Sequence, residues 1–166
     1  MKFIFMQIDE KELNTVLGFL KEAAVWLRDK KIDYWQDWLD PPEFFKDWIL
    51  TGLRQKQFHY IVNDVNEVIG MFRLQYDDEL FWGERDDRAA YIHSFAIKRS
   101  LGGKGTGYEV LRAIEEFVKE KGADYLRLDC GLKIKKLCEY YINYGFKKTG
   151  TITVNGEELL LLEKKL

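Results

Sequence analysis

Residues 91–107 read YIHSFAIKRSLGGKGTG and join three features in a fixed order. Tyr91–Ile97 is rich in aromatic and β-branched residues, which predicts a strand. Four glycines follow between positions 102 and 107. Tyr108–Lys121 then shows the apolar spacing of an amphipathic helix. This order of strand, glycine-rich turn and helix predicts an anion site where the helix begins.

The glycine-rich segment has the right chemistry to hold a pyrophosphate group. A helix N-terminus leaves several backbone N–H groups without a partner and carries about half a positive charge. Glycine permits positive φ and a close approach of the backbone to an anion. Lys98, Arg99 and Lys104 add positive charge nearby. The alternative is an ordinary glycine-rich turn, because the segment matches neither the P-loop nor the dinucleotide-binding pattern.

Size and composition predict one compact domain over residues 1–166. A chain of 166 residues with 46% hydrophobic residues can fill a sizeable core. A net charge of −2 argues against a nucleic-acid partner. We expect no membrane span, because no apolar run is long enough, and no signal peptide at the N-terminus. Two cysteines outside any CxxC pair and two histidines argue against a metal site and favour a reducing cytoplasm.

Hydrophobic periodicity predicts the element order βααβββαβαββ, which is an α/β or α+β class with a mixed central sheet. The segment Asp40-Pro41-Pro42-Glu43 predicts a helix start with Asp40 as its cap. The acidic segment Asp77–Asp87 is expected to be a loop. The expected strands are Phe3–Ile8, Phe58–Val62, Val68–Tyr76, Tyr91–Ile97, Tyr125–Cys130, Phe146–Val154 and Glu158–Leu162, and the expected helices are Glu10–Lys30, Asp40–Arg54, Tyr108–Lys121 and Ile134–Tyr144.

The strand and loop over residues 91–107 resemble the GNAT superfamily of N-acetyltransferases. In that family the loop reads Gln/Arg-x-x-Gly-x-Gly/Ala and leads into a long helix. Gly105 and Gly107 match the last two fixed positions, and Gly102 stands in place of Gln or Arg.

A second segment extends the resemblance over residues 91–150. The strand Leu126–Cys130 precedes a helix in which Tyr141 and Gly145-Phe146 match the family pattern Tyr-x-x-x-Gly-Phe. Ile134 replaces the Asn that usually begins this pattern. The early pattern from Trp26 to Trp35 is also similar to small bacterial members of the superfamily.

The resemblance implies an enzyme that moves an acetyl group from acetyl-CoA to the primary amine of a small molecule or peptide. In the family, the strand before the loop splays from its neighbour, and its backbone N–H groups meet the pantetheine and the thioester. Ile97 occupies the position of the oxyanion donor. The residues implied to bind the cosubstrate are Phe95, Ala96, Ile97, Lys98, Gly102, Gly103, Lys104, Gly105, Thr106, Gly107 and Tyr108.

Two catalytic side chains follow from the resemblance, each with a structural alternative. Tyr141 matches the proton donor of the family, and a phenol with a reference pKa near 10 can protonate a departing thiolate. A core tyrosine is the alternative, because Ile134 and Leu137 share its helical stripe. His93 lies four residues before Ile97, where relatives carry an acid or base, and an imidazole can relay the proton of the amine. A packed strand histidine is the alternative.

For other candidate side chains, the sequence allows either a functional or a structural role. Cys130 and Cys138 are expected to be buried apolar residues rather than nucleophiles, and His59 is expected to have no role. Three lysines near the last helix can meet the CoA 3′-phosphate or lie on a solvated face. Six aromatic residues can line an acceptor pocket or a homodimer interface. These sets are Lys133, Lys135 and Lys136, and Trp26, Trp35, Trp38, Phe44, Phe45 and Trp48.

The charge distribution favours a cationic acceptor. Residues 1–90 carry a net charge of −6 and residues 91–166 a net charge of +4. Six acidic residues lie between Asp77 and Asp87, and they can attract a small amine or polyamine. A solubilising surface loop is the alternative. Two other functions also remain open, namely a non-catalytic acyl-CoA sensor and an ATP-binding domain.

Overall fold

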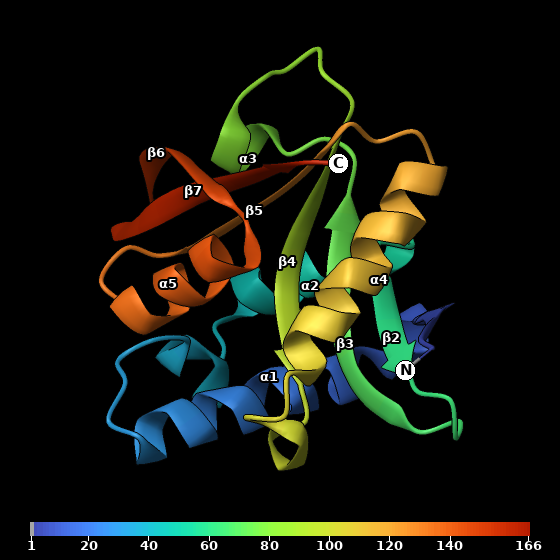
Figure 1. Cartoon of the computed structure of the whole chain (residues 1–166). Helices are drawn as coiled ribbons and strands as arrows, with labels where there is room; N and C mark the ends of the chain where they lie inside the picture. Colours follow the sequence, from blue (N-terminus) through green and yellow to red (C-terminus); the bar gives the residue numbers. More distant parts are fainter. Residues whose placement is uncertain (1) are drawn as a thin grey trace. The chain divides into compact units, whose positions relative to one another are not determined.

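The computed structural model describes residues 2–166, and its main elements follow the predicted order (Figure 1). Short 3₁₀ turns at Glu10–Glu12, Gln36–Leu39 and Arg99–Leu101 come in addition. The strands are β1 Ile4–Gln7, β2 Phe58–Val62, β3 Val68–Gln75, β4 Ala89–Ile97, β5 Tyr125–Gly131, β6 Lys147–Val154 and β7 Glu157–Lys165. The helices are α1 Leu13–Asp29, α2 Glu43–Arg54, α3 Glu79–Trp82, α4 Thr106–Glu120 and α5 Lys135–Tyr144.

The strands form a mixed sheet in the order β1-β2-β3-β4-β5-β7-β6. β4 and β5 are parallel, whereas the pairs β1–β2, β2–β3, β5–β7 and β6–β7 are antiparallel. The predicted α/β class with a mixed central sheet is therefore confirmed. By its internal packing the chain divides into two compact units. Unit 1 runs through Arg73 and includes Ser94–Val110, and unit 2 consists of Leu74–His93 and Leu111–Leu166.

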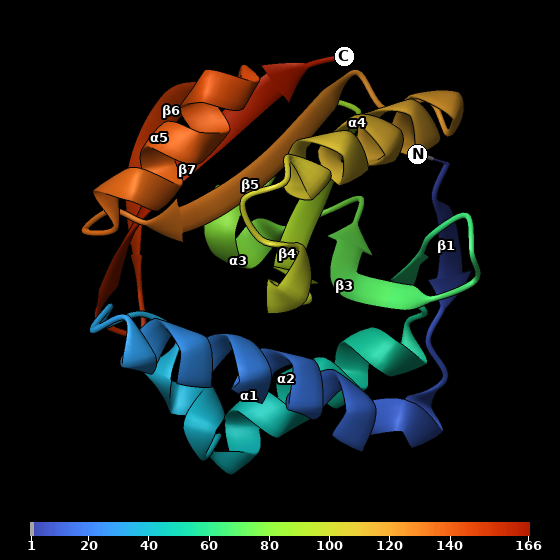
Figure 2. The same cartoon turned by 60° about the horizontal axis from the view of Figure 1, so that its bottom comes forward.

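Unit 1 packs α1 and α2 side by side, as Figure 2 shows. A capping box begins the first helical segment, because the Asp9 side chain accepts from backbone N–H groups and Glu12 accepts from the Asp9 N–H. The apolar face of α1 then becomes buried, as its 3.6-residue spacing predicts. Its core consists of Ile8, Val16, Leu20, Ile49, Leu53, Phe58, Tyr60, Val62 and Met71.

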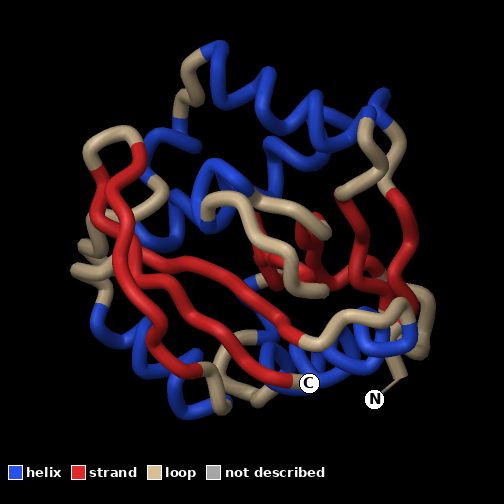
Figure 3. The backbone as a smooth tube through the Cα atoms, turned by 90° about the horizontal axis from the view of Figure 1, so that it is seen from above, coloured by secondary structure: helices blue, strands red, loops and turns tan. Residues whose placement is uncertain are grey.

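Unit 2 is built on the long β6–β7 hairpin, which ends at the C-terminus (Figure 3). Asn155 and Gly156 have φ values of 50° and 80°, so the turn requires two left-handed residues. Asn-Gly is the residue pair that favours such a two-residue turn, and the turn joins the two strands expected on either side of it. α5 packs against β5 and β7. Its last residue is Tyr144, as expected, and Gly145 follows as the C-cap with a φ of 121°.

Two sequence predictions about local structure are wrong. The acidic segment Asp77–Asp87 is not entirely loop, because Glu79–Trp82 forms the short helix α3. One turn is too short to show helical periodicity. Asp40 does not cap α2: the N-cap is Pro42, and no side chain donates or accepts there. The second proline lengthens the approach to the helix, and the chain enters α2 in an extended conformation.

None of the helices between residues 2 and 166 combines the length and the apolar character that crossing a bilayer requires.

Candidate functional site

The predicted anion loop lies in unit 1, between β4 and α4. Gly103 and Gly105 have φ values of 74° and 79°, which other residues rarely adopt. A Cβ atom added at either glycine would meet no heavy atom within 4 Å. The glycines are therefore required by the backbone conformation, and the space beside them is open.

The loop presents backbone donors at the beginning of α4. The N–H groups of Tyr108 and Glu109 donate to the Gly105 carbonyl at 3.0 and 3.2 Å. In contrast, no backbone N–H from Gly103 to Gly107 reaches a well-aligned acceptor within residues 2–166. These five N–H groups lie at the positive end of a helix of 15 residues, so they suit a phosphate or pyrophosphate.

The base of the loop is fixed to β3 and α1. β3 contains an extra residue, Ile69, opposite the step from Ile61 to Val62, and its carbonyl accepts from the Lys98 N–H at 2.8 Å. The Arg99 guanidinium lies 4.4 Å from the centre of the Trp26 ring, in a cation–π contact. β3 therefore holds Lys98, and α1 holds Arg99, at the end of β4.

The end of β4 lies unusually close to β3 within unit 1. A Cβ atom on Gly70 would be 2.4 Å from the Ala96 carbonyl oxygen, so only glycine fits there. Ser94 has a φ of 52°, a conformation that non-glycine residues rarely adopt and that costs about 1–3 kcal/mol. Such a residue interrupts the regular alternation of side chains along the strand. The strain therefore lies directly before Phe95–Ile97, the segment expected to meet the thioester.

Tyr141, the predicted acid, lies on α5 in unit 2 and is buried. Its ring packs at right angles to the rings of Tyr140 and Phe146, with centroids 5.3 and 5.9 Å away. The N-cap of α5 is Ile134, whose side chain makes no capping hydrogen bond. Its carbonyl accepts from the Leu137 and Cys138 N–H groups.

His93, the predicted base, lies in unit 2 between two carboxylates. Its Nε2 is 2.7 Å from Oδ2 of Asp78, and its Nδ1 is 3.5 Å from Oδ2 of Asp129. The Phe81 ring of α3 packs against the imidazole with centroids 4.7 Å apart. Burial raises the pKa of Asp129 to about 6, although the adjacent His93 opposes that increase. This cluster contains two functional candidates that the sequence did not single out.

Asp78 and Asp129 were missed for different reasons. Asp78 was grouped with an acidic surface loop, but one turn of helix at α3 places it in the interior. Asp129 lies in a strand that otherwise reads as core. A polar residue inside an apolar strand is the one sequence signal that could have drawn attention to Asp129.

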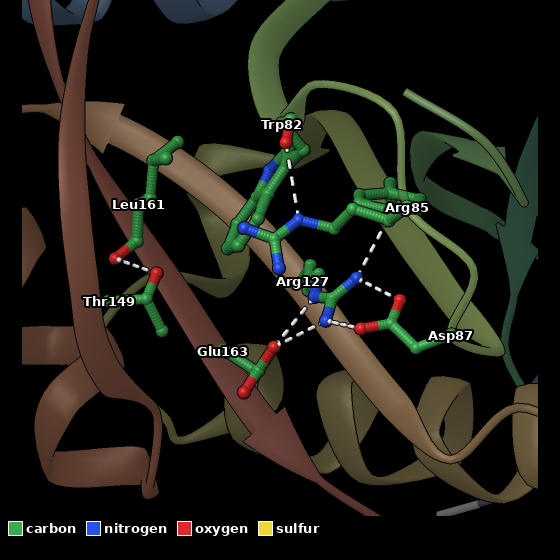
Figure 4. A network of polar contacts seen from close by, with 8 residues as sticks. Trp82, Arg85, Asp87, Arg127, Thr149, Leu161 and Glu163 are labelled. Carbon is green, nitrogen blue, oxygen red and sulfur yellow. Dashed lines mark hydrogen bonds and ion pairs between the residues drawn. The ribbon is translucent and has the colours of Figure 1, made fainter. Parts of the chain in front are cut away.

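A second charge cluster in unit 2 surrounds the buried guanidinium of Arg127 (Figure 4). The guanidinium donates to both Asp87 oxygens at 2.6 and 2.5 Å, to Glu163 at 2.7 Å and to the Tyr91 hydroxyl at 2.8 Å. Hydrogen bonds from Arg127 lower the pKa of Asp87. Arg127 therefore fixes the end of the acidic segment to the sheet.

The contacts of the remaining candidate side chains are explained by structural roles. The His59 ring stacks on Phe72 with centroids 5.4 Å apart, and its Nδ1 lies 3.1 Å from the Gln57 carbonyl oxygen. Cys130 and Cys138 are buried, and burial raises the pKa of the Cys130 thiol. Lys133, Lys135 and Lys136 are exposed. Within residues 2–166 no group of three His, Cys, Asp or Glu side chains is arranged to hold a metal.

The glycine loop, the strained β4 segment and the element order all point to one family. The model of the acetyltransferase (GNAT) family matches residues 20–146. This chain belongs to the GNAT family. It is 23% identical over 145 residues to YesJ of Bacillus subtilis (strain 168), called an uncharacterized N-acetyltransferase, and the match covers 84% of this chain and 79% of YesJ.

Solved structures of GNAT proteins share the fold. A GNAT acetyltransferase from Listeria monocytogenes 4b F2365 superposes with a TM-score of 0.76 at 20% identity, covering 99% of this chain and 95% of that one. PaiA N-acetyltransferase from Thermoplasma acidophilum, solved with coenzyme A, has a TM-score of 0.70 at 20% identity, with both chains covered completely.

The predicted family and the predicted class of enzyme, an acetyl-CoA-dependent N-acetyltransferase, are confirmed by these matches. The acceptor, the compartment, the oligomeric state and the role of each site residue stay predictions, as does the single domain over residues 1–166. The structure assigns the loop and residues 94–98 to unit 1, and His93 and Tyr141 to unit 2.

Proposed function

We propose that this protein transfers the acetyl group of acetyl-CoA to the primary amine of a small, cationic molecule. The observation that carries the proposal is the backbone of the glycine loop. Five consecutive N–H groups from Gly103 to Gly107 have no well-aligned acceptor in the described chain, and they begin a long helix. The family match supports the same cosubstrate.

The residues of the loop fit the pyrophosphate of CoA. Positive φ at Gly103 and Gly105 turns the backbone without a side chain in the open space beside it. Lys104 is exposed and adds a positive charge that favours the anion. Acetyl-CoA itself supplies the thioester. The backbone N–H groups of Phe95 to Ile97, at the end of β4, then bind and orient the reacting carbonyl, with Ile97 as the proposed donor. The Lys98 N–H is already held by the Ile69 carbonyl, so Lys98 contributes to this segment through its position and charge.

Tyr141 and His93 are proposed to move the protons of the reaction. The amine must lose one proton before it can attack, and His93 accepts that proton. As the carbon–nitrogen bond forms and the carbon–sulfur bond breaks, the Tyr141 hydroxyl protonates the leaving sulfur. The amide nitrogen releases a second proton, which returns the tyrosine to its neutral form through solvent. The sum is an amide, a thiol and one released proton.

The cationic acceptor is supported by the exposed part of the acidic segment. Asp77, Glu79, Glu84 and Asp86 are exposed and can attract a cation to the surface of unit 2. Asp78 is buried beside His93, and Asp87 is exposed but its carboxylate is bound by Arg127, so neither is free to attract a cation. A test of electrostatic steering must therefore leave these two residues unchanged.

The proposal is tested by calorimetry of acetyl-CoA binding to Gly105→Ala. The new methyl group lies in the open space beside the loop and forces a left-handed alanine, so we expect affinity to fall by about tenfold, or 1.4 kcal/mol. Gly122→Ala is the matched control. Gly122 lies just beyond the other end of α4, with a φ of 88° and equally open space, so its strain is similar. Equal affinities for the two variants would contradict the assignment of the loop.

A further inference from the structure

The two edge strands of the sheet differ in how they are protected against pairing with another chain. β6, at one end of the strand order, carries Lys147 and Lys148 and contains an extra residue, Thr149, that bulges from its ladder with β7. Lysines and bulges are common devices that prevent an edge strand from accepting a further strand. β1, at the other end, pairs with β2 in a continuous register and contains neither device.

The sequence around β1 is also apolar for an edge strand. The six residues from Phe3 to Ile8 include no charged residue and no proline. Ile4 and Met6 alternate onto one face of the strand, where their side chains are 52% and 53% exposed. A flat edge with exposed apolar side chains favours pairing with a strand of another chain, because pairing removes these side chains from water.

The hydrogen bonds between β1 and β2 show which backbone groups point away from the sheet. The Ile8 N–H donates to the Phe58 carbonyl at 3.0 Å, so Ile8 directs its backbone groups toward β2. In an antiparallel pair this direction alternates from one residue to the next. The residues at odd positions, among them Phe3 and Gln7, therefore direct their backbone groups toward the outer edge. No strand within residues 2–166 pairs along that edge.

We propose that β1 pairs antiparallel with β1 of a second copy of this chain, so that one sheet continues across a symmetric dimer. The two-fold axis passes between Phe5 of one copy and Phe5 of the other. Phe3 and Gln7 then exchange backbone hydrogen bonds with Gln7 and Phe3 of the second copy. On the exposed face, Ile4 packs against Met6 of the second copy, and Met6 packs against its Ile4.

This register follows from the symmetry and from the outward backbone groups. A two-fold axis perpendicular to the sheet pairs residues whose side chains lie on the same face, so the centre must fall on a residue. A centre at Phe5 pairs Phe3 with Gln7 on both sides. A centre at Ile4 or Met6 would instead place Gln7 or Phe3 opposite a residue beyond the end of the strand.

Charge at the two ends of the strand favours a second copy over another partner. Lys2 precedes the apolar stretch and Asp9 follows it, and both are exposed. Antiparallel pairing of two copies brings Lys2 of each beside Asp9 of the other. A uniformly basic or acidic peptide would match only one of these ends.

We expect the dimer to be reversible. Two strands of this length supply less contact area than the roughly 1,600 Å² of a standard interface. The expected Kd is therefore about 10–100 µM. The inference is independent of the proposed function, because association requires neither acetyl-CoA nor an acceptor.

Sedimentation velocity of the intact protein, from about 1 µM to about 500 µM, measures the association. We expect monomer at the low end and dimer at the high end. Met6→Lys should raise the Kd at least tenfold, because it places a charge against Ile4 of the second copy. Phe44→Lys is the matched control and should leave the Kd unchanged. Phe44 is also an exposed apolar residue of unit 1, at 59%, and it lies on α2 among the aromatic residues that the sequence offers as a dimer interface.

Amide hydrogen exchange of the wild type locates the interface without a substitution. The N–H groups of Phe3 and Gln7 should exchange more slowly at the high concentration than at the low one, because they become hydrogen bonded in the dimer. Exchange along β6, the other edge of the sheet, should not depend on concentration.

Disulfide cross-linking tests the register. Ile4 and Met6 of the second copy form a non-hydrogen-bonded pair, in which Cα atoms lie about 4.5 Å apart, close enough for a disulfide. On oxidation, a mixture of the Ile4→Cys and Met6→Cys proteins should form covalent dimers that contain one copy of each. A covalent dimer of Met6→Cys alone would contradict the register, because it would place the centre at Met6.

Three other results would overturn the proposal: a protein that stays monomeric up to about 500 µM, a dimer that Phe44→Lys weakens as much as Met6→Lys does, or a dimer that leaves the exchange of Phe3 and Gln7 unchanged. The second result would assign the interface to the aromatic residues of α2. The exchange experiment uses the wild type, so it decides the question even if Met6→Lys does not fold. A dimer that acetylates no amine would contradict the proposed function and leave this inference intact.

Discussion

Unit 2 contains two charge clusters that hold the two ends of the acidic segment. The cluster around His93 is enclosed, whereas the other consists of the buried Arg127 and two partly exposed carboxylates. At the Asp87 end, Arg127 donates short hydrogen bonds to Asp87, Glu163 and Tyr91. At Asp78, one contact to His93 is short, while the other carboxylate, Asp129, keeps a buried oxygen without a hydrogen bond. A cluster in which every charged group has hydrogen-bond partners holds a loop in place. A cluster with a buried carboxylate oxygen that makes no hydrogen bond favours a change in the protonation of that carboxylate.

The two clusters also change the stability of the protein with pH in opposite directions. Arg127 lowers the pKa of Asp87, so this pair stabilises the protein above the ordinary aspartate pKa and loses that contribution as pH falls. Burial raises the pKa of Asp129 to about 6. Its carboxylate therefore destabilises the fold, and stability decreases as pH rises from about 4 through 6. At neutral pH the Asp87–Arg127 pair therefore stabilises the fold, whereas the buried Asp129 carboxylate destabilises it.

The largest expected effect concerns the Arg127 cluster. Arg127→Met should lower the free energy of unfolding by about 3 kcal/mol at pH 7, because Asp87 and Glu163 lose their common partner and repel one another. The difference from wild type should shrink as the pH falls below about 4, where the carboxyls become neutral. Urea denaturation at several pH values measures both quantities.

Arg88→Met is the control for this change. Arg88 also forms a bidentate ion pair, with Asp124, but its side chain is 71% exposed. We expect its loss to cost less than about 0.5 kcal/mol. If Arg127→Met and Arg88→Met cost the same, burial of the Arg127 cluster contributes nothing and the comparison breaks down.

A smaller effect of opposite sign is expected at the cluster around His93. Asp129→Asn should raise the free energy of unfolding by about 2 kcal/mol at pH 8, because an amide avoids the burial of a charge. Near pH 4 the two proteins should be equally stable, since Asp129 is then protonated. The exposed Asp124→Asn serves as the control and should show no such gain. A loss of stability at pH 8 in Asp129→Asn would mean that the carboxylate is structural.

The sequence predicted the features that are encoded locally. The glycines between 102 and 107 need only the neighbouring strand and helix to define a loop at a helix N-terminus, and the loop lies where it was expected. Anion binding by this loop stays a prediction. The Asn155-Gly156 turn is likewise specified by two residues with positive φ. The mixed sheet followed from the order of periodic segments, because connections between strands and helices allow few topologies.

Contacts between distant residues were not predictable in the same way. Asp78, His93 and Asp129 are separated by 15 and 36 positions, and no local pattern links them. α3 was missed because a single helical turn has no period to detect. Asp40 was wrongly predicted to cap α2, because the backbone is extended at Pro42 and the helix therefore begins two residues later than Asp40 would allow. Long-range pairing and exact helix ends are decided by packing.

The most direct test of the function is thiol release from acetyl-CoA across a panel of cationic, neutral and anionic amines. We predict release with a cationic primary amine, equal in amount to the acetylated product. In Tyr141→Phe, which removes one hydroxyl, kcat should fall at least a hundredfold while acetyl-CoA affinity stays the same. Binding of acetyl-CoA without thiol release for any amine would contradict the account and favour a non-catalytic acyl-CoA sensor.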